Sequence, residues 1–489
     1  MTPLIIHKTI PLPPPSDTDR RALDQRIRDG LGIAPLRIPL SLLRSIHFPA
    51  GEKRKLPCTI GRTENEYRLI SMESTRSYSL ALDLGTTNLV GLLYDNIAQK
   101  DVLIRSLENP QIEFGSDILT RMHHAMAANS EEVRRVLTYG VNSLITGLCR
   151  EAGVNTRDIH ALAAAGNTAM THFFLGLDVS TIPVAPWTSV ARSPGFFSAS
   201  ELDLDLNPEA LVYVFPNAGS YVGGDITAGI LSSGMFRSDK TSILIDAGTN
   251  AEVVIGNREW MIVGAGAAGP ALEEDIPRIG KRANKGVVYD VEIRGGNVSC
   301  RTFDQCAPEG ICGSGMVSLL HELYRSGMID RSGTLTSGDH ITELDGEKVF
   351  SIACDGADVL QITQGELRNF IKSKAAMFTL LLVLTRSVGI SFRDIANVYV
   401  SGALGTGIDA AKAAGIGMLP AWPAEIVKPL GNSSLAGARL LLTDGGLVST
   451  VNEIVAKITY KHMHDDPEFM KEFLGAVFIP HTDPDVLKV

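Results

Sequence analysis

The sequence predicts an α/β protein made of two similar halves that face each other across a cleft. The stretch Ser79–Asp95 reads as an apolar strand, a tight polar turn and a second apolar strand. The stretch Thr241–Gly256 repeats this pattern about 160 residues later in the chain. Both turns begin with Asp-x-Gly-Thr. The repetition indicates a duplicated domain with one hairpin on each wall of the cleft.

The two turns have the composition of a phosphate-binding loop. Glycine adopts backbone conformations closed to larger residues, and the amides and hydroxyls that follow it converge on an anion. A carboxylate beside a phosphate is tolerated when a cation lies between them, so Asp83 and Asp246 predict magnesium, bound through water. An ordinary hairpin contains the same residue types, and the repeat is what favours a phosphate site. The other predicted contact residues are Gly85, Thr86, Thr87, Asn88, Gly248, Thr249 and Asn250.

Two glycine-rich segments that lead into helices are further candidates. In Pro216–Ile230, glycines precede Asp225, which would hold the water shell of the metal or polarise an attacking water. A plain N-cap role is the alternative for this carboxylate. In Pro308–Asp330, a glycine-rich turn opens an amphipathic helix, which is typical of a phosphate or ribose cradle. The candidate residues of this cradle are Gly313, Ser314 and Gly315.

Length and composition exclude several classes of protein. The 489 residues suffice for two or three domains, each with its own core. Hydrophobic residues make up 44% and charged residues 20%, as in globular rather than disordered chains. The net charge of −10 argues against nucleic acid as the main partner. We find neither a signal peptide nor a membrane-spanning apolar run, and therefore expect a cytoplasmic protein without a membrane partner.

The six cysteines give no support for a metal cluster. They form no CxxC pair and show no ferredoxin spacing. Cys300, Cys306 and Cys312 are evenly spaced by six residues, which leaves a loose metal set as the alternative to scattered buried thiols. We expect buried thiols, a reducing compartment and no iron–sulfur cluster in this chain.

The first 76 residues differ from the rest of the chain. The run Pro11–Pro15 is extended and stiffened by proline. A helix is expected from Ser16, as N-cap, to about Gly32, and a second short helix from Pro39. Alternating strands follow, so we expect a small α+β module that acts as a linker or adaptor.

The paired hairpins resemble the phosphate motifs of the sugar kinase, heat-shock 70 and actin superfamily. This resemblance implies a duplicated actin-like ATPase fold, with two ribonuclease-H-like halves around a nucleotide cleft and with ATP and Mg²⁺ as ligands. The superfamily also has an adenosine motif, an apolar strand that runs into small residues near the C-terminal end. Asn397–Asp409 has this form, and the adenine would lie against Gly402, Ala403 and Gly405.

Further segments carry a closer resemblance. They are Asn109–Asp117, Gly166–Gly176, Val222–Asp225, Ala268–Glu273, Gly310–Gly315, Ile362–Glu366 and Gly431–Ala438. Together they look like the ATP-dependent reductive activators of corrinoid proteins, and the similarity runs from about Leu12 to the C-terminus. Residues 1–76 look like the linker module of that family, 77–240 like its middle domain, and 241–489 like its C-terminal domain.

The resemblance implies a specific activity. Such activators couple ATP binding and hydrolysis to the reduction of cobalt(II) to cobalt(I) in a corrinoid protein, and electrons normally pass through an iron–sulfur domain. This chain departs from the family pattern, because it starts at the linker and ends without a cysteine cluster. It also has Leu404-Gly405-Thr406 in place of the usual Phe-Gly-Asn, and Arg278 where cysteine is frequent.

We therefore expect a corrinoid protein as partner and a separate ferredoxin or other low-potential donor as the source of electrons. A homodimer is compatible with these observations. One alternative is a nucleotide-gated binding module without a redox role. The other is a small-molecule kinase of the same superfamily, although the sequence identifies no dedicated acid in a substrate pocket.

Overall fold

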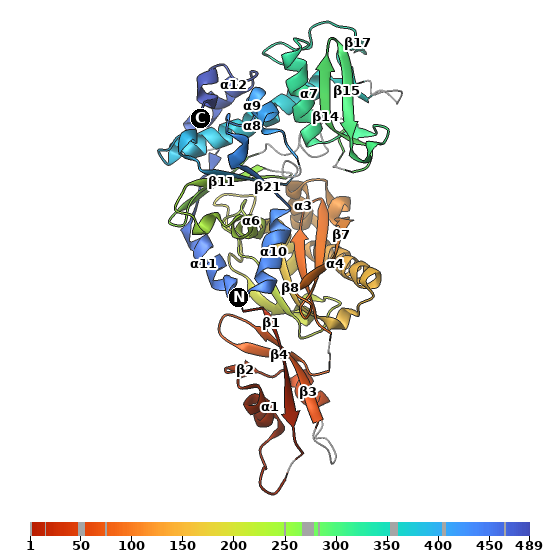
Figure 1. Ribbon diagram of the computed structural model, residues 1–489, viewed down its shortest axis with the longest axis vertical. Helices are drawn as coiled ribbons and strands as arrows, with labels where there is room; N and C mark the ends of the chain where they lie inside the picture. Colours follow the sequence, from red (N-terminus) through yellow and green to blue (C-terminus); the bar gives the residue numbers. More distant parts are fainter. Residues whose placement is uncertain are drawn as a thin grey trace. The chain divides into compact units, whose positions relative to one another are not determined.

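The computed structural model forms two compact units (Figure 1). The residues that it describes are 2–14, 16–46, 54–73, 76–248, 251–266, 278–281, 284–352, 360–402, 407–463 and 466–489. Unit 1 contains Met1–Ser232 and Ser434–Ala456, and unit 2 contains Ser233–Ser433 and Lys457–Val489. A short segment near the C-terminus thus folds with the N-terminal half of the chain.

Unit 1 begins with a small α+β module. Its strands are β1 (Ile5–Leu12), β2 (Leu36–Arg37), β3 (Arg54–Arg62) and β4 (Tyr67–Ser71), in the sheet order β1-β3-β4-β2, and its helices are α1 (Leu23–Leu31) and α2 (Leu40–Ser45). Helix α1 is amphipathic, and Ile27 and Leu31 pack against Ile10 in a separate small core. This core is what allows so short a segment to form a sheet with a covered face.

The predicted start of the first helix is wrong. Helix α1 begins at Leu23 with Ala22 as N-cap, seven residues beyond Ser16. Ser16 instead accepts a hydrogen bond from the Asp19 backbone N–H at 3.1 Å and closes a local turn. Serine side chains stabilise such turns as well as helix caps, which is why the sequence pattern misled here. The second helix does follow Pro39 as predicted.

The main sheet of unit 1 has six strands in the order β7-β6-β5-β8-β10-β9. These strands are β5 (Tyr78–Leu84), β6 (Asn88–Asp95), β7 (Lys100–Glu108), β8 (Ile159–Gly166), β9 (Gly195–Ser198) and β10 (Leu211–Val214). Strands β5, β6 and β7 form an antiparallel meander, whereas β8 and β10 continue the sheet parallel to β5. Every residue of β8 is buried, as expected for a parallel strand covered on both faces.

Unit 1 contains further helices after the N-terminal module, of which α4 and α5 contact this sheet. They are α3 (Ile118–His124), α4 (Ser130–Ala152), α5 (Thr168–Leu175), α6 (Gly224–Ser233), α10 (Ser433–Thr443) and α11 (Leu447–Lys457). Helix α4 packs against β6 and β7, and its buried positions recur at helical spacing (Figure 1). Helix α10 approaches α6 so closely that a methyl group on Gly437 would lie 2.1 Å from the Ala228 carbonyl oxygen.

Unit 2 contains a second six-stranded sheet in the order β21-β20-β11-β12-β13-β22. These strands are β11 (Ser242–Ala247), β12 (Ala251–Gly256), β13 (Met261–Gly266), β20 (Asn397–Gly402), β21 (Val427–Gly431) and β22 (Ile458–Tyr460). Two three-stranded sheets accompany it, built from β14 (Val287–Arg294), β15 (Asn297–Thr302) and β16 (Gly310–Ile311), and from β17 (Ile341–Leu344), β18 (Glu347–Ile352) and β19 (Leu360–Thr363).

The helices of unit 2 are α7 (Gly313–Arg325), α8 (Gln364–Ser387), α9 (Ala410–Gly415) and α12 (Pro467–Ala476). Helix α8 is the centre of this core, with most of its 24 residues buried. Its N-terminus is fixed by a capping box, in which Thr363 and Glu366 bond each other's backbone N–H groups. No helix within the described ranges is long and apolar enough to cross a membrane.

The two six-stranded sheets repeat one topology. The meander β5-β6-β7, followed by parallel β8 and β10, corresponds to the meander β11-β12-β13 with parallel β20 and β21. The first strand of each meander occupies the centre of its sheet and carries the Asp-x-Gly-Thr aspartate near its end. This duplication confirms the fold class predicted from the paired hairpins.

A partly buried ion pair attaches the N-terminal module to the rest of unit 1. Arg68 of β4 pairs with Glu209, and their side chains are only 15% and 14% exposed. Ser41 also donates a hydrogen bond to Glu209. We expect Glu209→Ala to lower the free energy of unfolding by about 2 kcal/mol, because it leaves the Arg68 charge partly buried without its partner. Urea unfolding followed by circular dichroism measures this loss.

The matched control is Glu151→Ala, which removes a carboxylate from an exposed pair with Arg105. The Glu151 side chain is 53% exposed and the Arg105 side chain 36%. We therefore expect the free energy of unfolding to change by no more than about 0.5 kcal/mol. Equal unfolding midpoints for the two variants would contradict the role given to Glu209.

Candidate functional site

The first Asp-x-Gly-Thr segment forms the predicted hairpin. Strands β5 and β6 pair antiparallel up to Leu84 and Leu89. Gly85, Thr86 and Thr87 form the turn, and Asn88 is the first residue of β6, where it pairs with Glu108 of β7. A methyl group on Gly85 would lie 2.3 Å from the Asn88 carbonyl oxygen, so no larger residue fits there. The turn is therefore a close-packed backbone structure that depends on glycine.

Two asparagines from other elements fix this turn. Asn109, at the end of β7, donates from Nδ2 to the Gly85 carbonyl oxygen at 3.0 Å and from its backbone N–H to the Thr87 carbonyl oxygen at 2.8 Å. Asn167, the N-cap of α5, donates from Nδ2 to Thr86 Oγ1 at 2.9 Å. Because Asn109 is fully buried, these bonds hold the turn from behind without competition from water.

A buried arginine completes the support of the turn. Arg121 of α3 is fully buried and donates from Nη1 to the Thr86 carbonyl oxygen at 2.6 Å and from Nε to the Gly115 carbonyl oxygen at 2.8 Å. Its Nη2 has no hydrogen-bond partner among the described residues. Burial lowers the pKa of Arg121 to about 10, so the guanidinium stays protonated at neutral pH. A positive charge behind the turn favours an anion in front of it.

The sequence did not predict that Arg121 supports this turn. Asn109 and Gly115 belong to a segment that carried the family resemblance, but Arg121 lies on a short helix where a solvated side chain is the ordinary expectation. The signal that could have revealed it is the polar cluster that precedes the helix, because buried backbone carbonyls require donors.

Asp83 is held at the end of β5. It is half-buried, and Ser434 at the start of α10 donates a hydrogen bond from Oγ to Asp83 Oδ1 at 2.9 Å. The two residues are 351 positions apart in the chain, so no local pattern predicts their contact. The bond fixes the orientation of the carboxylate that was predicted to hold magnesium.

Asp225 lies in the first turn of α6, after Gly224. Its Oδ1 accepts a hydrogen bond from the Ile226 backbone N–H at 2.8 Å. Asp225 is thus the second residue of α6 and bonds a first-turn N–H group, and its role toward a metal or an attacking water stays a prediction. A methyl group on the preceding Gly223 would lie 2.3 Å from the Asn167 Cα atom. The start of α6 thus packs directly against the residue that supports the Thr86 turn.

The second hairpin repeats this arrangement in unit 2. Strands β11 and β12 pair up to Ala247 and Ala251, and Asp246 is half-buried at the same position relative to the turn as Asp83. Gly248 lies in the turn. Thr249 and Asn250, which were predicted to bind phosphate, lie outside the described residues.

The strand of the predicted adenosine motif meets this hairpin. Strand β20 runs parallel to β11, with Ser401 opposite Asp246 and Gly402 opposite Ala247. Gly402 has φ +71°, and a methyl group there would lie 2.4 Å from the Ala247 carbonyl oxygen and 2.7 Å from Asp246 Oδ1. The structure therefore brings Gly402 and Asp246 together. Ala403 and Gly405 lie outside the described residues.

Gly166 occupies in unit 1 the place that Gly402 occupies in unit 2. It lies at the end of β8 opposite Leu84, and a methyl group there would approach the Leu84 Cβ atom to 2.7 Å. Both halves thus place a glycine beside the strand that carries the aspartate. The repeat therefore extends from the hairpins to the neighbouring parallel strands.

Gly313, Ser314 and Gly315 form the first turn of α7, as predicted for a helix-opening segment. A methyl group on Gly315 would lie 2.4 Å from the Val288 carbonyl oxygen of β14. Packing of α7 on β14 accounts for this glycine without a ligand. A role of the segment as a ribose or phosphate cradle stays a prediction.

The cysteines differ partly from expectation. Cys58, Cys149 and Cys312 are buried free thiols, whereas Cys306 is free but only half-buried. Cys300 is disulfide-bonded, so the expectation of a thiol is wrong at this position. Among the described residues, no group of three or more histidine, cysteine or acidic side chains is arranged to hold a metal ion.

The residues present fit an anionic ligand with magnesium. The glycine-dependent turn at Gly85 suits phosphate oxygens, and the buried Arg121 guanidinium favours an anion there through its charge rather than by direct contact. Magnesium keeps several waters and binds through one or two carboxylates together with substrate phosphates. Each unit taken by itself offers one such carboxylate at the end of a central strand, Asp83 in unit 1 and Asp246 in unit 2.

Two sheets of repeated topology, each with an aspartate at the end of its central strand, define a protein of the actin-like class known as ASKHA. Comparison with family models gives the particular branch. Residues 240–489 match the C-terminal domain of RACo, the ASKHA domain, and residues 78–238 match the RACo middle region. The chain therefore belongs to the RACo family, the reductive activators of corrinoid proteins.

Individual relatives agree with this assignment. The chain is 30% identical over 414 residues to the corrinoid activation enzyme RamQ of Eubacterium limosum, covering 81% of this chain and 69% of the relative. It is 24% identical over 417 residues to a Co(II) methylated amine-specific corrinoid protein reductase of Methanosarcina barkeri, covering 79% and 74%. The solved structure of a reductive activator for corrinoid, iron–sulfur protein superimposes with a TM-score of 0.91 at 33% identity, covering 99% of this chain and 80% of that one.

We expect Arg121→Met to weaken Mg-ATP binding about tenfold, because the turn loses a charged donor to the Thr86 carbonyl and the positive charge behind it. Isothermal titration calorimetry measures the affinity, and circular dichroism shows whether the variant is folded. The matched control is Arg134→Met on α4, whose half-buried side chain pairs with the exposed carboxylates of Glu131 and Asp203. Equal affinities of the two folded variants would overturn the role of Arg121.

Proposed function

We propose that this chain is an ATP-dependent activator of a corrinoid protein, which supports reduction of cobalt(II) to cobalt(I) with electrons from a separate donor. The observation that carries the proposal is the preorganised turn Gly85–Thr87, with buried Arg121 behind it, in a chain of the RACo family. The names of the relatives, a corrinoid activation enzyme and a corrinoid protein reductase, support the choice of partner.

The two hairpins are the phosphate-binding elements in this proposal. Asp83 and Asp246 would hold the water shell of Mg²⁺, and the ion would supply charge that polarises the phosphoryl oxygens. Backbone N–H groups and hydroxyls of the turns bind phosphate oxygens, and Asn109, Arg121 and Asn167 keep the first turn in that conformation. The residues assigned to these turns are Gly85, Thr86, Thr87, Asn88, Gly248, Thr249 and Asn250.

The remaining candidate residues have positioning roles. Adenine lies against Gly402, Ala403 and Gly405, and the helix start at Gly313–Gly315 faces the ribose or a phosphate. Asp225, in the first turn of α6, orients the attacking water and accepts its proton. The close approach of Gly223 to Asn167 supports this role, because it ties the start of α6 to the phosphate-binding turn.

ATP hydrolysis can be coupled to action on the corrinoid protein only if the ATP-bound and ADP-bound states of this chain differ in their affinity for that partner. Hydrolysis removes the γ-phosphate contact of the hairpins and so changes which conformation of the protein is favoured. The partner must then change nucleotide affinity by the same factor, about 5- to 150-fold in typical cases. The donor supplies the single electron that converts cobalt(II) to cobalt(I), and ATP hydrolysis supplies free energy only.

We expect Asp83→Asn and Asp246→Asn each to lower magnesium-dependent ATP turnover at least tenfold, because an amide is a weaker ligand for the water shell of Mg²⁺. Phosphate release at varied Mg²⁺ concentration measures the effect. The matched control is Asp345→Asn, at an exposed turn in unit 2. If both variants bind and hydrolyse Mg-ATP like the control, this assignment of the metal-binding residues is wrong.

We also expect cobalt(I) to form only when ATP, this chain and a low-potential donor are all present with a cobalt(II) corrinoid protein. Cobalt(I) absorbance is followed anaerobically with donor and corrinoid protein fixed, with and without ATP and with and without this chain. Equal cobalt(I) yield in the four combinations would exclude the activator role. ATP-dependent binding of the corrinoid protein without any cobalt(I) would indicate a nucleotide-gated binding module instead.

A further inference from the structure

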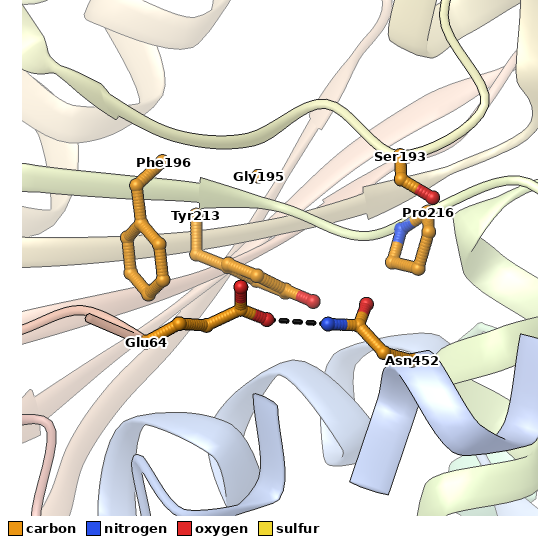
Figure 2. A pocket seen from close by; sticks show the side chains of 7 residues that line it. All are labelled: Glu64, Ser193, Gly195, Phe196, Tyr213, Pro216 and Asn452. Carbon is orange, nitrogen blue, oxygen red and sulfur yellow. Dashed lines mark hydrogen bonds between the residues drawn. The ribbon is translucent and has the colours of Figure 1, made fainter. Parts of the chain in front are cut away.

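A pocket of about 150 Å³ lies in unit 1, lined by three segments that are distant in sequence. Glu64 comes from the turn between β3 and β4, Phe196 and Tyr213 come from β9 and β10, and Asn452 comes from α11 (Figure 2). Ser193, Gly195 and Pro216 complete its wall. None of the assignments made to the nucleotide site involves these residues.

The pocket is a built feature of the fold. Phe196 and Tyr213 are directly opposite in the antiparallel register of β9 and β10, and their ring centroids are 5.0 Å apart. Asn452 donates a hydrogen bond from Nδ2 to the Glu64 carboxylate, which ties α11 to the N-terminal module (Figure 2). The register of β9 and β10 thus places the two aromatic rings side by side. The hydrogen bond between Asn452 and Glu64 places the polar groups opposite them.

The Tyr213 hydroxyl points to a ligand. Tyr213 is only 2% exposed, and it lines the pocket, where its hydroxyl can contact whatever the pocket holds. Figure 2 shows that it is directed toward the side of the pocket where Asn452 and Ser193 lie. A hydroxyl that faces a pocket forms its hydrogen bonds with the water or the ligand in that pocket, so Tyr213 adds a polar group to an otherwise aromatic wall.

The charge of the pocket selects a cation. The Glu64 carboxylate is the sole formal charge among the lining residues, and it faces two aromatic rings. Aromatic faces attract cations, and a carboxylate adds a charged acceptor for an N–H donor. A cavity of similar volume holds a molecule the size of benzene, which sets the ligand at roughly six non-hydrogen atoms or fewer.

We propose that this pocket binds a small alkylammonium ion that carries at least one N–H group. The N–H donates to the Glu64 carboxylate or to the Tyr213 hydroxyl oxygen, and the alkyl groups contact Phe196, Tyr213 and Pro216. Asn452 keeps the carboxylate in place through its Nδ2 hydrogen bond. The site is independent of the nucleotide-binding hairpins, so its test does not depend on the proposed activity.

The test uses trimethylammonium chloride as the probe, titrated into the full chain at neutral pH and followed by line broadening of its methyl resonance in proton NMR. We expect saturable binding, together with a rise in the melting temperature that follows the same concentration dependence. tert-Butanol, a neutral molecule of similar size, and sodium chloride at matched ionic strength are the solution controls, and neither is expected to reproduce the effect.

Variants separate the charge from the hydroxyl. Glu64→Gln removes the charge at an exposed position and is expected to weaken trimethylammonium binding about tenfold. The matched control is Glu343→Gln, at an exposed position of β17, which should bind like the parent chain. Tyr213→Phe keeps the ring and is expected to weaken trimethylammonium binding about two- to tenfold, but to leave binding of tetramethylammonium, which has no N–H, unchanged.

Three outcomes would overturn the proposal. Absence of saturable binding to the parent chain would mean that water alone fills the pocket. Equal binding of tert-butanol and trimethylammonium would show that the pocket does not recognise charge. Unchanged affinity in folded Glu64→Gln would place the ammonium ion elsewhere on the protein.

Discussion

The hydrogen bond from buried Arg121 to the Thr86 carbonyl oxygen is the constraint on which the candidate site depends. A guanidinium removed from water is unfavourable unless its donors find acceptors, and here backbone carbonyls provide them. The acceptor belongs to a turn whose glycine allows no side chain, so the arginine and the turn stabilise each other. The same arrangement leaves one buried donor, Nη2, without a partner among the described residues, and keeps a positive charge behind the turn where an anion is expected.

Duplication gives the two halves a common framework, but the halves are not equivalent. Gly166 and Gly402 occupy matching positions beside the two hairpins, yet only Gly402 has the positive φ that favours glycine for conformational reasons. Gly166 is required by close packing against Leu84 instead. One repeated position thus requires glycine for close packing in unit 1 and for a positive φ at the last residue of β20 in unit 2.

The sequence predicted what depends on local pattern. Each hairpin has apolar strands and a glycine-containing turn within a few residues, and α4 and α8 have long periodic apolar faces, so all four were found. The start of α1 was missed because Ser16 forms a turn with the same side-chain chemistry as a cap. The burial of Arg121 could not be predicted, because it depends on how the chain packs around a short helix. The contact of Ser434 with Asp83 and the pocket could not be predicted either, because they join residues hundreds of positions apart.

The segment 434–456 shows how distant parts of the chain combine in one element. Ser434, at one end of it, bonds Asp83, and Asn452, near the other, bonds Glu64. Between them the connection of α10 and α11 is fixed by the N-terminus, since Leu4 donates to the Leu442 carbonyl oxygen and Gly445 donates to the Thr2 carbonyl oxygen. The N-terminal module is therefore more than an appendage of unit 1. It holds the helix pair that orients the Asp83 carboxylate, so the geometry of the candidate metal ligand depends on contacts made by residues at both ends of the sequence.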